Sequence, residues 1–68
     1  MSNIKTLTFE ELINKENRLV SEISDLEKAL ELIPSDSVLA TLSLRATIKY
    51  KTNKLTELRS EISKRVTI

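Results

Sequence analysis

Apolar residues recur at intervals of three and four along residues 9–32, which is the spacing of an amphipathic helix. In heptad terms the stripe occupies positions a and d, as in a coiled coil, and Glu16 is its one polar interruption. We therefore predict a long helix over residues 9–32 that buries one face. The apolar stripe consists of Phe9, Leu12, Leu19, Ile23, Leu26, Leu30 and Ile33.

A second helical pattern covers residues 36–65, and Lys51 is its one basic interruption. The stripe of this helix consists of Leu44, Ile48, Leu55, Leu58, Ile62 and Val66, preceded by Ala40 and Thr41. The sequence also contains no Gly and one Pro, which favours long helices over strands joined by tight turns. The fold class is therefore predicted to be all-α.

Capping residues mark where the two helices begin and end. Thr8 and Glu11 have the spacing of a capping box, in which each side chain accepts a hydrogen bond from the backbone of the other. Pro34 disfavours helical geometry at the preceding residue and ends the first helix. Ser35 or Asp36 is then predicted to cap the second.

A short link between two long helices predicts an antiparallel helical hairpin that forms a single domain over residues 1–68. From the predicted helix ends, facing residue numbers sum to roughly 68. This register places Glu16 opposite Lys51 as a buried polar layer that fixes the alignment. Residues 1–7 are predicted to form an arm that packs on the end of the second helix, where Ile4 and Leu7 would cover Ile62 and Val66.

A further set of apolar residues projects away from the predicted seam. Two helices alone would leave it in water, and contiguous exposed apolar surface usually marks a contact site. The first interpretation is a homodimer that closes a four-helix bundle, and the second is a groove for a helix of another protein. The predicted contact residues are Val38, Leu39, Leu42, Ala46 and Tyr50 in the second helix, and Ile13 and Val20 in the first.

Composition narrows the classes of function. A chain of 68 residues buries a small core, and without Cys or His it has neither disulfides nor the usual zinc ligands, so self-association is the expected support. The same absence removes Ser–His and Cys–His nucleophiles, and no Gly-rich phosphate loop is present. We predict no catalytic residues, metal or cofactor. The N-terminus lacks the apolar core of a signal peptide and no stretch is long enough to span a membrane, which favours the cytoplasm.

Charge is divided unequally between the two halves of the chain. Residues 1–35 hold four basic and seven acidic side chains, whereas residues 36–68 hold seven basic and three acidic ones. Opposite charges favour side-by-side packing of the helices. Exposed ion pairs influence the choice of partner more than they stabilise the fold. The basic residues of the second helix also include a candidate anion site beside the one Tyr of the chain, formed by Arg45, Lys49, Tyr50 and Lys54.

These observations predict a non-enzymatic helical protein that self-associates and serves as a protein-interaction or oligomerisation module. Its predicted partners are a second copy of itself and another protein. One alternative is a small oligomer that binds an anionic ligand such as a nucleotide between subunits. Another is weak binding of nucleic acid along the basic second helix, although the interleaved Glu57 and Glu61 oppose it.

Overall fold

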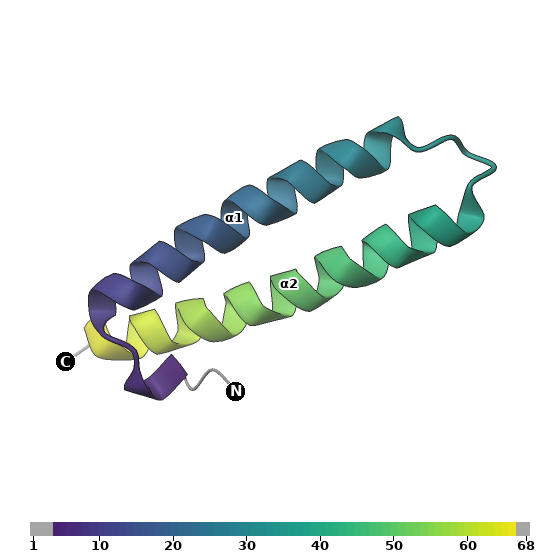
Figure 1. Cartoon of the computed structure of the whole chain (residues 1–68). Coiled ribbons are helices and arrows are strands. Elements are labelled where there is room, and N and C mark those ends of the chain that lie inside the picture. Colours follow the sequence, from purple (N-terminus) through teal and green to yellow (C-terminus); the bar gives the residue numbers. More distant parts are fainter. Residues whose placement is uncertain (1–3, 67–68) are drawn as a thin grey trace.

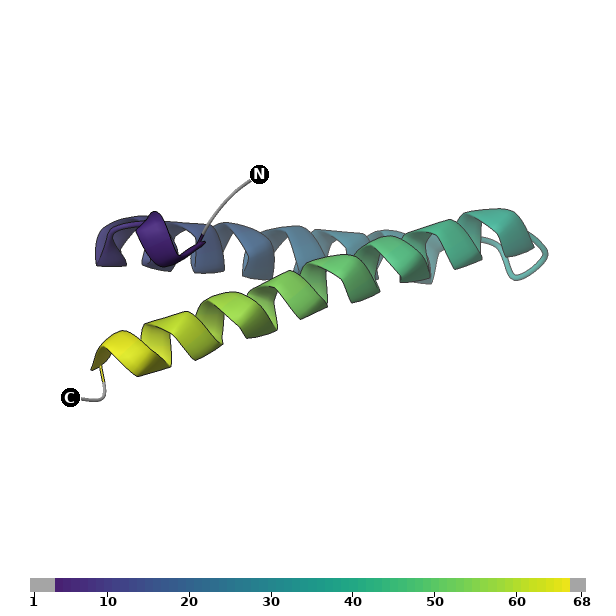
Figure 2. The same cartoon turned by 90° about the horizontal axis from the view of Figure 1, so that it is seen from below.

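The structure, a computed structural model, describes residues 4–66 and is an antiparallel pair of long helices. A short 3₁₀ helix, η1 (Ile4–Thr6), precedes α1 (Phe9–Leu32) and α2 (Val38–Val66). The two long helices lie side by side and run in opposite directions (Figure 1). Seen from below, they cross at a shallow angle (Figure 2). The all-helical hairpin expected from the apolar pattern is confirmed.

The start of α1 has the predicted capping box. The backbone N–H of Thr8 donates to Glu11 Oε1 at 2.8 Å, and the backbone N–H of Glu11 donates to Thr8 Oγ1 at 3.1 Å. Together these bonds satisfy two of the N–H groups that a helix start leaves without partners. At the other end, Ile33 has extended backbone geometry immediately before Pro34, as expected for a residue that precedes proline.

The loop between the helices is a turn followed directly by α2. The N–H of Ser37 donates to the carbonyl of Pro34 at 3.0 Å, and the carbonyl of Ser37 accepts the first helical bond from Thr41 at 3.1 Å. Ser35 and Asp36 are therefore used as turn residues, and Ser37 occupies the capping position. As a result α2 begins at Val38, two residues later than the pattern predicted.

Burial along the seam between α1 and α2 is uneven. Among residues 4–66 the buried apolar side chains are Leu12, Leu55 and Leu58, and all three lie in the half of the hairpin that contains the chain ends. The predicted stripe residues nearer the loop are half-buried. At the outer ends of the seam, Phe9 is 46% exposed and Val66 64% exposed. The core is thus concentrated away from the loop.

The predicted Glu16–Lys51 layer is corrected by the structure. Lys51 Nζ lies 3.0 Å from a carboxylate oxygen of Glu22, and Arg59 Nε lies 2.9 Å from Glu16 Oε2. None of these four side chains is buried. The late start of α2 shifts the register, and long side chains lean toward the N-terminus of their own helix, which for α2 means toward the loop. Each base on α2 therefore reaches an acid closer to the loop than the one directly opposite.

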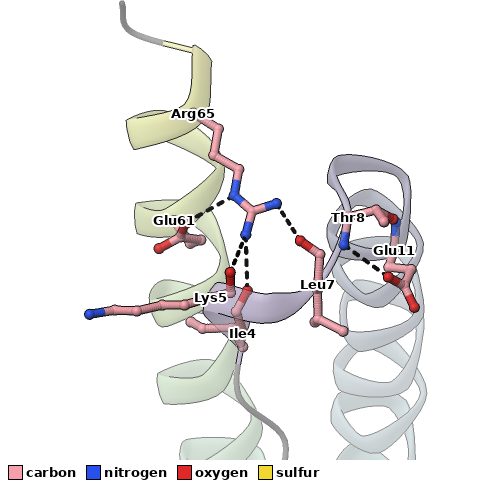
Figure 3. Close-up of polar contacts among 7 residues, drawn as sticks. All are labelled: Ile4, Lys5, Leu7, Thr8, Glu11, Glu61 and Arg65. Atoms are coloured by element: carbon pink, nitrogen blue, oxygen red, sulfur yellow. Dashed lines mark hydrogen bonds and ion pairs between the residues drawn. The ribbon is translucent and has the colours of Figure 1, made fainter.

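The segment that precedes α1 is held against the end of α2 by Arg65 (Figure 3). Arg65 Nη2 donates to the carbonyls of Ile4 at 3.3 Å and Lys5 at 3.0 Å, and Nη1 donates to the carbonyl of Leu7. Its Nε donates to Glu61 Oε2 at 3.0 Å, which orients the guanidinium. Of the arm predicted over residues 1–7, residues 1–3 lie outside the described part of the chain.

Candidate functional site

Exposed apolar side chains form a line on α2, made up of Val38, Leu39, Leu42 and Ala46 and named here the outer apolar line. Val38, Leu39 and Leu42 are 60%, 84% and 58% exposed. At about 100° per residue, Leu42 projects about 160° away from the seam residue Leu44. The line therefore projects away from the seam with α1, and Val38, Leu39 and Leu42 stay exposed in the single chain.

Apolar exposure continues at the loop end of the hairpin. Leu32, the last residue of α1, is 83% exposed, and Val38, the first of α2, lies across the loop from it. The buried side chains lie at the opposite end of the hairpin. The loop half of the molecule therefore combines a thin core with an exposed apolar surface, and it is the candidate contact site.

Ile13 and Val20, the two contact residues predicted in α1, lie on a different side of the molecule. Both are one helical turn from Glu16 along α1, so they share its side, where Glu16 pairs with Arg59 of α2. Ile13 is half-buried and Val20 is 43% exposed. They form a second and less exposed apolar surface that is separate from the outer apolar line.

Tyr50 borders an open groove of about 680 Å³, named here the Tyr50 groove, where three segments meet. On α1 it is lined by Lys15, Arg18, Leu19 and Glu22, and on α2 by Tyr50, Lys54, Glu57 and Leu58. Both sets have spacings of three and four, so each comes from one face of its helix. Ile4 and Lys5 of η1 close one end. Most of the lining surface is apolar.

Two of the four predicted anion-site residues, Tyr50 and Lys54, line this groove. Lys54 Nζ lies 5.7 Å from the centre of the Tyr50 ring, within the range of a cation–π contact. Arg45 and Lys49 do not line it. Sequence reasoning missed Lys15 and Arg18, which contributed only to the count of basic side chains in residues 1–35. Lys15 lies four residues before Leu19 and Arg18 four before Glu22, and this helical spacing was the available signal.

Electrostatics around the groove favours anions. Four basic and two acidic side chains line it, and one of the acids, Glu22, is already paired with Lys51. The other, Glu57, lies 4.0 Å from Lys54. Among residues 4–66, the Arg18 side chain has neither a hydrogen bond nor an ion pair. Its guanidinium therefore remains available to a ligand.

Metal binding and membrane insertion are two further possibilities for residues 4–66. No group of three or more acidic side chains there converges to hold a metal ion. Neither long helix has the length and apolar character that crossing a membrane requires. No protein-family model matches the chain, and no curated protein or solved structure matches it either.

Proposed function

We propose that this protein is a non-enzymatic module that self-associates through the outer apolar line and then presents its remaining surface to another protein. The observation that carries the proposal is the location of exposed apolar side chains beside the part of the hairpin with the thinnest core. Two hairpins joined in this way contain four helices, and the two α2 helices form the inner pair of the bundle. The predicted compartment is the cytoplasm.

The elongated shape of one chain supports packing against a second copy. The hairpin measures 50 × 19 × 18 Å, with a radius of gyration of 14.6 Å. A compact domain of the same length has a radius of gyration of about 11 Å. A stable architecture usually packs at least two layers around one core, and a pair of helices forms the smallest version of that arrangement. A second hairpin would double the helices around the thin loop half.

The solvent-exposed surface area of one chain also supports packing against a second copy. The chain exposes 5377 Å². Monomeric proteins of this mass expose about 4,300 Å², so the excess is about 1,000 Å². A stable interface of standard size removes about 800 Å² from each partner. Burying the loop half against a second copy would therefore bring the exposed area per chain close to that of a compact protein.

A two-fold arrangement centred on Leu42 buries apolar side chains of the two copies against each other and brings side chains of opposite charge near one another. In antiparallel contact of two α2 helices, Val38 of one copy lies at the level of Ala46 of the other, and Leu42 packs on its own counterpart. Lys49 then comes level with Ser35 of the second copy, next to Asp36 in the loop that precedes α2. Because the same patch serves both partners, the contact closes after two chains.

Sedimentation equilibrium on a matched pair of variants tests this proposal. Lysine has nearly the same helix propensity as leucine, so Leu42→Lys introduces charge into the outer apolar line without weakening α2. Ser60→Lys introduces the same charge on the same side of α2, about 27 Å away. We expect the wild-type chain and Ser60→Lys to have twice the chain mass of 7.7 kDa. Leu42→Lys is expected to have the mass of one chain, with unchanged helicity by circular dichroism.

Two results would contradict self-association through this surface. The first is a wild-type chain that stays monomeric up to millimolar concentration, which would assign the outer apolar line to a helix of another protein. The second is a dimer that Leu42→Lys leaves intact, which would assign the contact to the side that contains Ile13 and Val20. Val20→Lys then identifies that interface in the same measurement.

A further inference from the structure

We propose that the Tyr50 groove binds a small organic anion with an apolar body, within a single chain. The proposal concerns the side of the hairpin next to the outer apolar line and does not require self-association. Three segments that are distant in the sequence, namely η1, α1 and α2, supply its walls. Its volume of about 680 Å³ lies within the usual range for small-molecule sites, about 300–1,000 Å³.

The floor and one wall of the groove fit an apolar body. Leu19 of α1 and Leu58 of α2 both line the groove, and Leu58 is 3% exposed, so it offers a fixed surface. Ile4 closes the end, because Arg65 holds η1 in place through its backbone carbonyls (Figure 3). Tyr50 is 63% exposed and presents its ring at the edge. A flat or aliphatic body can pack against these four side chains.

The rim of the groove fits one anionic group. Arg18 and Lys15 lie on the α1 side, and Lys54 lies on the α2 side over the Tyr50 ring. The Arg18 side chain has no partner among residues 4–66, and guanidinium binds carboxylate, sulfonate or phosphate through paired hydrogen bonds. The acids Glu22 and Glu57 on the same rim disfavour a polyphosphate, whose several charges would meet both. The geometry therefore favours a ligand with one acidic group rather than a nucleoside triphosphate.

Three probes separate the contribution of the charge from that of the body. Anilinonaphthalene sulfonate has an aromatic body and one anionic group. Phenylnaphthylamine has the same body without the sulfonate, and inorganic sulfate has the charge without the body. By fluorescence titration we expect anilinonaphthalene sulfonate to bind once per chain and phenylnaphthylamine to bind at least about fivefold more weakly, since it forms no ion pair. Sulfate alone is expected not to displace the bound probe at equal concentration.

Three single substitutions test whether the probe binds in the Tyr50 groove. Arg18→Gln removes an exposed side chain that has no partner within residues 4–66, so the fold is unaffected, and the affinity for anilinonaphthalene sulfonate is expected to fall about tenfold. Tyr50→Leu keeps the helix and removes the ring, with a smaller expected loss. Arg45→Gln is the matched control, because it removes the same charge from α2 outside the groove. We expect it to bind as the wild type does.

The same titration distinguishes this proposal from the previous one. Leu42→Lys is expected to bind the probe normally even where it is monomeric, because Leu42 lies outside the groove. Wild-type affinity in Arg18→Gln would overturn the groove proposal. An equal loss in Arg18→Gln and Arg45→Gln would also overturn it, since binding would then follow net charge. Loss of binding in Leu42→Lys alone would place the probe on the outer apolar line instead.

Discussion

At the scale of single residues, Arg65 joins the two ends of the described chain. Its guanidinium donates to three backbone carbonyls of the segment before α1 and to Glu61 on its own helix. The Arg65 side chain is 25% exposed, whereas that of Arg59, which has one ion pair, is 58% exposed. The number of bonds and the degree of burial differ between these two arginines, so their contributions to stability should differ too.

Replacing Arg65 should therefore destabilise the fold more than replacing Arg59. We expect Arg65→Gln to lower the free energy of unfolding by about 1–2 kcal/mol, because charged donors to partly buried backbone carbonyls contribute more than neutral ones. Arg59→Gln should change it by less than about 0.5 kcal/mol, as for an exposed ion pair. Urea denaturation of both variants provides the measurement. Equal effects would show that Arg65 does not hold η1.

At the scale of the element, the start of α1 depends on reciprocal bonds between Thr8 and Glu11. The Thr8 backbone N–H donates to the Glu11 carboxylate and is the main reason that the pKa of Glu11 lies below its ordinary value. The Thr8 hydroxyl and the positive charge of Lys15 lower the pKa further, and partial desolvation opposes them. The charged form of Glu11 is thus the one that α1 prefers.

The sign of the pH effect follows from this lowered pKa. The stabilisation by Glu11 is present above the ordinary carboxyl pKa and is lost as the pH falls through the lowered folded-state pKa. We expect circular dichroism to show an acid-induced loss of helix stability that is smaller in Glu11→Gln, whose amide keeps an acceptor but does not titrate. An identical acid-induced loss in the wild type and in Glu11→Gln would show that Glu11 is not its source.

Loss of the Thr8 cap should destabilise α1 at every pH. Thr8→Ala removes the hydroxyl that accepts from the Glu11 N–H, and we expect a loss of about 1 kcal/mol in thermal or urea unfolding at neutral pH. Thr47→Ala is the control, because its hydroxyl bonds back to the carbonyl of Ser43 within α2 and caps nothing. An equal loss in both variants would contradict a role specific to the cap.

At the scale of the whole molecule, the uneven core makes stability depend on association. Leu12 is fully buried within one chain, whereas Leu39 is 84% exposed there. Leu12→Ala should cost about 2–5 kcal/mol whether or not the chain is dimeric. Leu39→Ala should cost nothing in an isolated hairpin and should destabilise only a dimer that covers the outer apolar line.

Protein concentration provides the measurement for this difference. Partner binding stabilises by mass action, so the wild-type Tm should rise with protein concentration, and the Tm of Leu42→Lys should not. We expect Leu39→Ala to lower the wild-type Tm most at high concentration, where the dimer dominates. A wild-type Tm that is independent of concentration would contradict self-association across the range tested.

The sequence by itself determined the elements of this protein. The helix of residues 9–32 and the capping box of Thr8 and Glu11 follow from local rules, namely the spacing of apolar residues and the hydrogen bonds of a helix start. The exposure of Val38, Leu39 and Leu42 was also predictable, because residues that project far from a seam cannot be covered by it. Periodicity and capping act over a few residues, so one sequence suffices to read them.

Only the tertiary structure decided how the two helices meet. The start of α2 depended on whether Ser35 and Asp36 became turn or helix, and that choice shifted the register. The partners of Lys51 and Arg59 then followed from the direction in which long side chains lean. The Tyr50 groove and the Arg65 contacts join residues of α2 to η1 and α1 across the fold. Contacts between distant segments depend on a register set by only a few residues, and local pattern does not specify it.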